Sequence, residues 1–130
     1  MGPRVTLDSG ALSALASGHV GLRADLRVLQ RRGVQAVVPV PVLAECVTGN
    51  GPRDANTNRV LRRLPVLAST ELIARRAGLL RHAARLPGST VDALVVATAE
   101  QDGGGVVITG DPGDLRALAE PTIVVVRPLP

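Results

Sequence analysis

The chain has 130 residues and a formal net charge of +4, and all of its basic residues are Arg. Because Phe, Tyr and Trp are absent, stacking of a nucleic-acid base on an aromatic side chain is excluded. Because Lys is also absent, chemistry that requires a lysine, such as Schiff-base formation, is excluded, and the modest excess of positive charge favours an anionic partner.

Short apolar runs alternate with segments of helical periodicity along the chain. In chain order we predict strand 5–7, helix 9–16, helix 22–32, strand 34–38, helix 42–48 and a loop at 49–57. There follow helix 58–63, strand 66–68, helices 70–86 and 91–101, strand 106–109, helix 112–118 and strand 122–126. This alternation is typical of an α/β fold with a mainly parallel sheet, in which ligands bind beyond the carboxyl ends of the strands.

We expect a single domain spanning residues 1–130, in the cytoplasm. The lone Cys46 cannot form an internal disulfide, and its apolar helical context favours a small core residue over a reactive thiol. The stretch MGPRVTLDSG lacks the apolar core of a signal peptide. No apolar run approaches the roughly 20 residues that a membrane span needs, so no membrane association is expected.

Four acidic residues fall where the predicted sheet presents its carboxyl edge: Asp8, Glu45, Asp92 and Asp111. Each has a simple structural explanation when taken alone. Asp8 and Asp111 suit the N-caps of the helices that follow them, and Asp114 suits the second position of a capping pair. Asp92 suits a helix N-terminus, although the very apolar helix around it indicates a packed position, and Glu45 suits a solvated helix face.

Taken together, the four carboxylates would repel one another, and each would raise the pKa of its neighbours. Folding alone does not favour such a cluster unless a cation lies within it. His19 and His82 lack the spacing of a zinc site. Hard cations prefer oxygen ligands, so the pattern predicts Mg²⁺ or Mn²⁺, which can activate water and neutralise charge on a phosphate.

Four stretches, LDSGALSAL, VPVLAECVTG, STVDALVVATA and VVITGDPGDL, resemble the acidic motifs of PIN-domain ribonucleases, specifically the VapC-type toxins of bacterial toxin–antitoxin systems. The resemblance covers essentially the whole chain, with the motifs in order and at matching spacing. It implies a three-layer α/β/α domain, a homodimer, and inhibition by a cognate VapB-type antitoxin that covers the groove and the active site. It also implies an endoribonuclease that depends on Mg²⁺ or Mn²⁺.

The resemblance also implies roles for individual residues. The metal-binding, catalytic carboxylates would be Asp8, Glu45, Asp92 and Asp111. Ser9 and Thr109 would be supporting hydroxyls beside the site, and Asp114 would support the pocket or bind metal through water.

Arginines are the candidates for holding RNA, because no lysine or aromatic residue is available. Arg23, Arg27 and Arg31 recur every four residues along one predicted helix, where like charges cost a few tenths of a kcal/mol. Arg81 and Arg85 form a second candidate pair. A solvated face, a stripe for RNA phosphates and a surface for an acidic partner all fit this pattern.

Other folds that gather acids around Mg²⁺ fit less well. A receiver domain needs paired acids after its first strand and a lysine, whereas Asp8 stands alone and Lys is absent. A haloacid-dehalogenase-like phosphatase needs Asp-x-Asp, and LDSGA lacks the second Asp. The remaining alternative is a catalytically silent PIN domain that binds RNA or protein and keeps its acids for metal-dependent stability.

Overall fold

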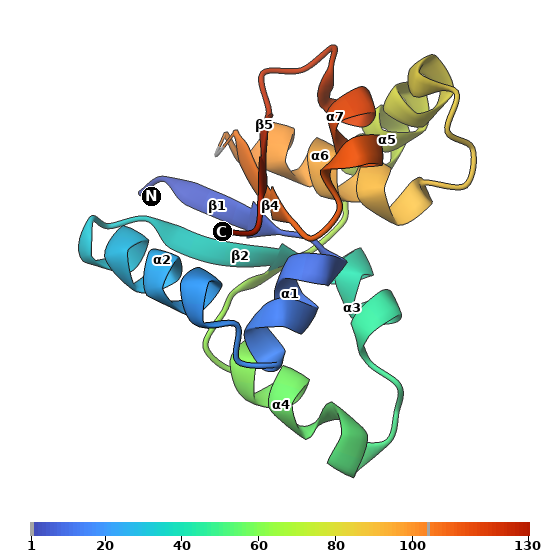
Figure 1. Ribbon diagram of the computed structural model, residues 1–130. Helices are drawn as coiled ribbons and strands as arrows, with labels where there is room; N and C mark the ends of the chain where they lie inside the picture. The colour runs from blue at the N-terminus through green and yellow to red at the C-terminus, as the bar shows by residue number, and fades with distance from the viewer. Residues whose placement is uncertain (1, 104) are drawn as a thin grey trace.

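A five-stranded parallel sheet forms the centre of the computed structural model, which describes residues 2–103 and 105–130 (Figure 1). The strands are β1 (Arg4–Leu7), β2 (Gln35–Pro39), β3 (Val66–Leu67), β4 (Val106–Thr109) and β5 (Val125–Pro128). Their order across the sheet is β3-β2-β1-β4-β5, and all neighbouring pairs are parallel. The predicted α/β fold with a parallel sheet is confirmed.

Helices cover both faces of the sheet and complete the predicted three layers. They are α1 (Ser9–Ala16), α2 (Val20–Arg31), α3 (Val40–Cys46), α4 (Gly51–Leu61), α5 (Glu71–Ala84), α6 (Thr90–Asp102) and α7 (Pro112–Ala119). Helices α5, α6 and α7 pack on one another on one side, and α1, α2 and α4 lie on the other (Figure 1). No helix in the described part of the chain is both long and apolar enough to cross a membrane.

The central strand β1 is a switch point in the topology. The chain passes from β1 to β2 on one side, and the later strand β4 pairs with β1 on the other. Loops from opposite halves of the sheet therefore meet beyond the carboxyl ends of β1 and β4, where parallel sheets form ligand sites.

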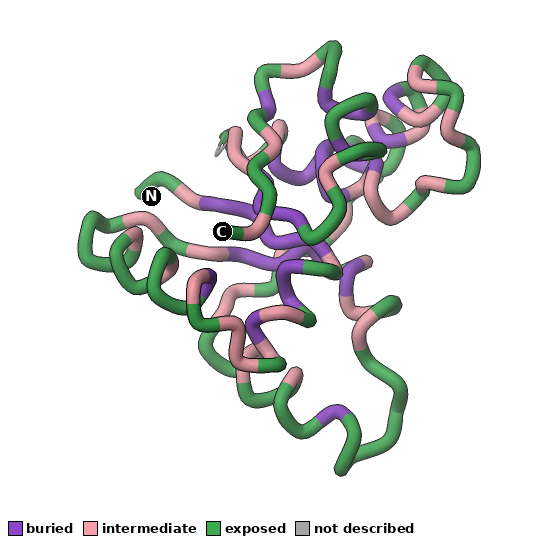
Figure 2. Tube along the Cα trace, in the orientation of Figure 1, coloured by how far each residue is buried: buried purple, intermediate pink, exposed green. Residues whose placement is uncertain are grey.

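The core is aliphatic, as the absence of aromatic residues requires. Leu7, Val37 and Val107 of three adjacent strands are fully buried, and Figure 2 shows the buried residues concentrated along these strands and α6. Strands covered on both faces read as continuous apolar runs, which is why they were recognisable in the sequence. In α6, Val95 and Val96 are both fully buried because the helix lies between the sheet and α5.

The predicted loop at 49–57 is wrong, because α4 begins at Gly51. The Asn50 side chain caps this helix by accepting a hydrogen bond from the Arg53 N–H at 3.0 Å. The carboxylate of Asp54, which is buried, accepts bonds from the Thr48 N–H, the Thr48 hydroxyl and the Gly49 N–H. The hydrogen bonds from Thr48, the hydroxyl first, lower the pKa of Asp54. Turn-forming residues here start a helix early instead of extending a loop.

The last strand begins at Val125, three residues after the predicted start. The Thr122 hydroxyl donates to the Ala119 carbonyl at 2.7 Å and accepts from the Val124 N–H at 3.0 Å. These bonds extend the turn after α7, so the β-branched run enters the sheet late.

Candidate active site

Asp8 anchors the candidate site at the end of β1. Its Oδ1 accepts a hydrogen bond from the Ala11 N–H at 2.8 Å and caps α1, and its Oδ2 accepts one from the Thr109 hydroxyl. The residue is only 5% exposed. Burial raises the pKa of Asp8, and the bonds from Thr109 and Ala11 offset part of this rise. The predicted helix-capping role of Asp8 is therefore confirmed, and it places a buried carboxylate at the sheet edge.

Thr109 joins the two halves of this edge. It ends β4 and is fully buried. Its hydroxyl donates its single proton to Asp8 and accepts a hydrogen bond from the Asp111 N–H at 2.9 Å. Asp111, in turn, caps α7 by accepting from the Gly113 N–H at 3.4 Å, and its side chain is exposed. One buried hydroxyl therefore fixes Asp8 and the backbone of Asp111 relative to each other.

Two glycines allow this approach, and the sequence analysis missed both. A Cβ on Gly10 would lie 3.1 Å from the Cα and N of Gly110, and a Cβ on Gly110 would lie 3.2 Å from the Cα of Gly10. The backbones of α1 and of the segment after β4 are thus in direct contact. The only sequence signal was a glycine two residues after Asp8 and another directly before Asp111.

Glu45 reaches the same edge from α3. Its Oε1 accepts a hydrogen bond from the hydroxyl of Ser9, and its side chain is otherwise exposed. The next residue, Cys46, packs against the core, and its thiol donates to the Ser9 carbonyl at 3.5 Å. Burial raises the pKa of the Cys46 thiol, which makes it less reactive, as expected of a structural cysteine.

Asp92 lies in the first turn of α6 and is half-buried. Burial is the largest cause that raises its pKa, to about 6, followed by repulsion from Asp8, Glu45, Asp114 and Asp111. The fold therefore brings four other carboxyl groups within electrostatic reach of Asp92. Ser89, the residue before α6, makes no side-chain hydrogen bond to the helix, and its hydroxyl instead donates to Asp114 Oδ2 at 3.3 Å.

The donor set fits a hard cation that keeps part of its water. All the groups on this edge are carboxylates or hydroxyls. Burial and then repulsion from the other carboxylates raise the pKa of Asp92, so a cation would stabilise its charged form. Within the described residues, however, no three His, Cys, Asp or Glu side chains lie close enough to form a ready ligand set. A hydrated Mg²⁺ held by one or two carboxylates suits this arrangement better than a closed protein cage.

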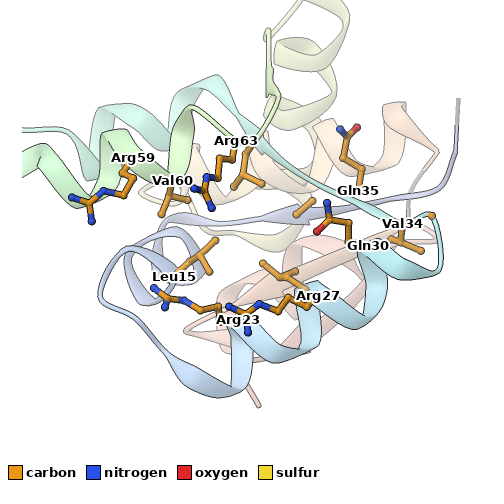
Figure 3. Close-up of a pocket in the computed structure, with 13 residues that line it drawn as sticks. Leu15, Arg23, Arg27, Gln30, Val34, Gln35, Arg59, Val60 and Arg63 are labelled. Atoms are coloured by element: carbon orange, nitrogen blue, oxygen red, sulfur yellow. The ribbon is translucent and has the colours of Figure 1, made fainter.

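The candidate arginines fall into two groups: Arg23 and Arg27 lie away from the carboxylates, whereas Arg81 hydrogen-bonds to Thr90, two positions before Asp92. Arg23 and Arg27 line a groove of about 790 Å³ between α2, α4 and the start of β2 (Figure 3). Glu45 is in α3, which follows the other end of that strand. Arg81 and Arg85 lie at the end of α5, and Arg31 is exposed in the last turn of α2.

The protein-family model of the PIN domain matches residues 5–121. The chain belongs to the PIN-domain family. Among curated protein sequences, none matches it significantly.

Solved structures of toxin–antitoxin complexes share the fold of this PIN domain. A chain of the Rickettsia felis VapBC2 complex with promoter DNA has a TM-score of 0.79 at 14% identity, with 98% of this chain and 99% of that chain covered. A chain of DNA-bound VapBC from Salmonella typhimurium gives 0.76 at 17%, with 97% and 98% covered. A toxin–antitoxin complex from Klebsiella pneumoniae gives 0.67 at 22%, with 93% and 95% covered. The predicted resemblance to VapC-type proteins is confirmed at the level of the fold.

Proposed function

We propose that this PIN domain is a metal-dependent endoribonuclease, the toxin of a VapBC-type pair, and that it hydrolyses RNA phosphodiester bonds with Mg²⁺ or Mn²⁺. The observation that carries the proposal is the position of Asp92, whose pKa is raised to about 6 by burial and then by repulsion from four other carboxylates. A cluster of this kind destabilises the fold unless a cation offsets the repulsion, and a phosphodiester is a substrate that a carboxylate-held cation can activate.

Asp8, Glu45, Asp92 and Asp111 would hold the metal, one or two of them directly and the others through its water molecules, with Asp114 as an outer acid. When bound, the cation would supply an activated water and neutralise charge on the phosphate. Asp8 is held rigid by its bonds to Ala11 and Thr109, so it suits a fixed ligand. Glu45 is exposed and is positioned by Ser9, so we assign to it the removal of a proton from the attacking water.

The proposed antitoxin partner is supported by the groove between α2 and α4. Arg23 and Arg27 lie on one wall and Arg59 and Arg63 on the other, and we call these four residues with the aliphatic floor between them the arginine groove (Figure 3). The floor includes Leu26, Val60 and Leu64. Aliphatic floor and basic walls are complementary to an amphipathic antitoxin segment that carries acidic residues along its edges.

The proposed homodimer is supported by apolar side chains on α5. Leu72 is 60% exposed and Leu79 is 64% exposed, and they lie two turns apart on one face of the helix. A second copy of the chain could cover this face and remove both side chains from water.

Mapping of RNA ends in cells tests the proposal. Induction of the wild-type protein is expected to create new RNA ends at recurring sites, whereas induction of an Asp92→Asn variant at the same level is not. The same new ends in both cultures would show that Asp92 takes no part in cleavage, and no new ends in either would contradict nuclease activity.

A catalytically silent PIN domain is the second candidate. It is favoured by the lack of a ready three-residue ligand set within the described residues. A silent domain would bind RNA or a protein partner but would cleave none of several RNA classes in Mn²⁺. An active one would cleave in Mn²⁺ and stop when EDTA is added.

A further inference from the structure

The C-terminal end of α5 lies beside the loop that leads into α6 (Figure 1). Arginine side chains form a small basic hollow there. It has a volume of about 280 Å³ and is lined by Arg81, His82, Arg85 and Pro87; we call it the α5 hollow. None of the ion pairs in the described chain involves Arg81 or Arg85, so the charge of the two guanidinium groups is not neutralised by a carboxylate. A concentrated, unpaired positive charge suits a small anionic group.

Hydrogen bonds connect the α5 hollow to the helix that carries Asp92. Arg81 Nη1 donates to the Thr90 hydroxyl at 2.7 Å and to the Pro87 carbonyl at 3.3 Å. Both acceptors are neutral, so the guanidinium keeps its full charge. Thr90 is the first residue of α6, two positions before Asp92. The hollow is therefore fixed next to the first turn of the helix that contributes to the carboxylate cluster.

The backbone of Arg85 has a left-handed conformation, with φ of 57° and ψ of 41°. It ends α5 in a Schellman motif, in which the Leu86 N–H donates to the Arg81 carbonyl and the Arg85 N–H to the His82 carbonyl. Every other residue with a positive φ in the described chain is a glycine. A glycine here would remove the steric cost of the Cβ, so the presence of Arg indicates a use for its side chain.

We propose that the α5 hollow binds a backbone phosphate of the RNA strand, a short distance along the strand from the cleaved bond. The proposal rests on the nuclease function proposed above. Arg85 and Arg81 would hold the phosphate through guanidinium N–H groups, a contact that positions RNA without reading its sequence. The acid on this side is Asp114, whose carboxylate accepts a bond from Ser89, so the cationic contact also offsets repulsion between the cluster and the strand.

The experiment measures the binding of a labelled single-stranded RNA by fluorescence anisotropy, in EDTA so that no cleavage occurs, at several NaCl concentrations. The variants are Arg85→Gly, the charge-retaining Arg85→Lys, and Arg75→Gln as a control. Arg75 lies on the same helix but outside the hollow, where it forms an ion pair with Glu71. Arg75→Gln and Arg85→Gly each remove one positive charge, so the control matches the change in net charge.

We expect Arg85→Gly to reduce the slope of log affinity against log salt by about 0.7, which corresponds to about fivefold weaker binding at 0.1 M salt. Its melting temperature is expected to rise, because glycine suits the left-handed position. Arg85→Lys and Arg75→Gln are expected to keep the wild-type slope.

The possible results distinguish a failure of the proposed phosphate subsite from a failure of the proposed nuclease function. If the wild type binds RNA and Arg85→Gly keeps the wild-type slope of log affinity against log salt, the subsite alone is overturned. The same holds if Arg85→Lys and Arg85→Gly reduce this slope equally. A wild-type protein that neither binds nor cleaves RNA would overturn the proposed function and the subsite together.

Discussion

Replacement of Asp92 by Asn is expected to stabilise the metal-free protein at neutral pH. The Asp92 carboxyl has its pKa raised from the ordinary 3.8 to about 6, first by burial and then by the neighbouring carboxylates. That difference sets a ceiling of about 3 kcal/mol on the cost of the charge. Because the side chain is only half-buried, solvent screening reduces the expected gain in unfolding free energy to about 1–2 kcal/mol.

The sign of the pH dependence follows from the raised pKa. The folded state binds the Asp92 proton more tightly than the unfolded chain does, so the charge costs no stability well below pH 4. The cost grows as pH rises from about 4 to about 6 and is complete above that range. The stabilisation by Asp92→Asn is therefore expected at pH 7.5 and is expected to shrink to a few tenths of a kcal/mol near pH 4.

Urea unfolding in EDTA at both pH values measures this effect. Asp25→Asn is the matched control, because Asp25 is exposed on α2 and lies outside the cluster. Addition of Mg²⁺ is expected to stabilise the wild type more than Asp92→Asn, since a bound cation removes the repulsion. If Asp92→Asn were neutral or destabilising at pH 7.5 in EDTA, the inference that the carboxylates repel one another would be refuted.

Three further predictions concern the site and the groove. Thr109→Val removes the hydroxyl that donates to the buried Asp8 carboxylate and is expected to lower the free energy of unfolding in urea by about 1.5–3 kcal/mol. Thr109→Ser keeps this hydroxyl and is expected to be close to wild type. Equal stability of the two variants would contradict the proposed role of the hydroxyl. Gly10→Ala is expected to lower the free energy of unfolding by about 1–3 kcal/mol, because the new Cβ would lie 3.1 Å from backbone atoms of Gly110. The control Gly78→Ala has open space around its Cβ and is expected to stabilise α5 by up to about 1 kcal/mol. Similar effects of the two substitutions would refute the close contact. Arg59→Glu combined with Arg63→Glu is expected to weaken capture of the antitoxin at least tenfold in a pull-down titration while RNA cleavage is kept; unchanged capture would place the partner elsewhere.

The sequence was most informative where one pattern dominates. Strands β1 and β4 and helix α6 were predicted because strands and helices buried on several sides are apolar throughout. The α/β alternation then required the acids after β1 and β4 to meet at one edge, and the repulsion raising the pKa of Asp92 agrees with this placement. The metal-ligand and catalytic roles of these acids remain predictions.

The missed features depend on contacts between distant segments. Nothing local to Gly10 or Gly110 shows that their backbones touch, because the contact exists only once β1 and β4 are paired. The hydrogen bonds that hold Asp54 turn a polar, turn-rich stretch into the start of α4. The groove between α2 and α4 likewise needs the packed helices, so helical spacing alone could not separate a solvated stripe from a groove wall.

The central claim is that the carboxylate cluster cleaves RNA with a divalent cation, and the rate of RNA cleavage by purified protein tests it most directly. Wild-type protein is expected to cleave RNA in Mn²⁺ or Mg²⁺ and to stop in EDTA. Asp92→Asn and Asp8→Asn, shown to be folded and free of antitoxin, are expected to lose activity by at least a hundredfold, about 2.7 kcal/mol of transition-state stabilisation. Cleavage by either variant at the wild-type rate, or wild-type cleavage that persists in EDTA, would contradict the account.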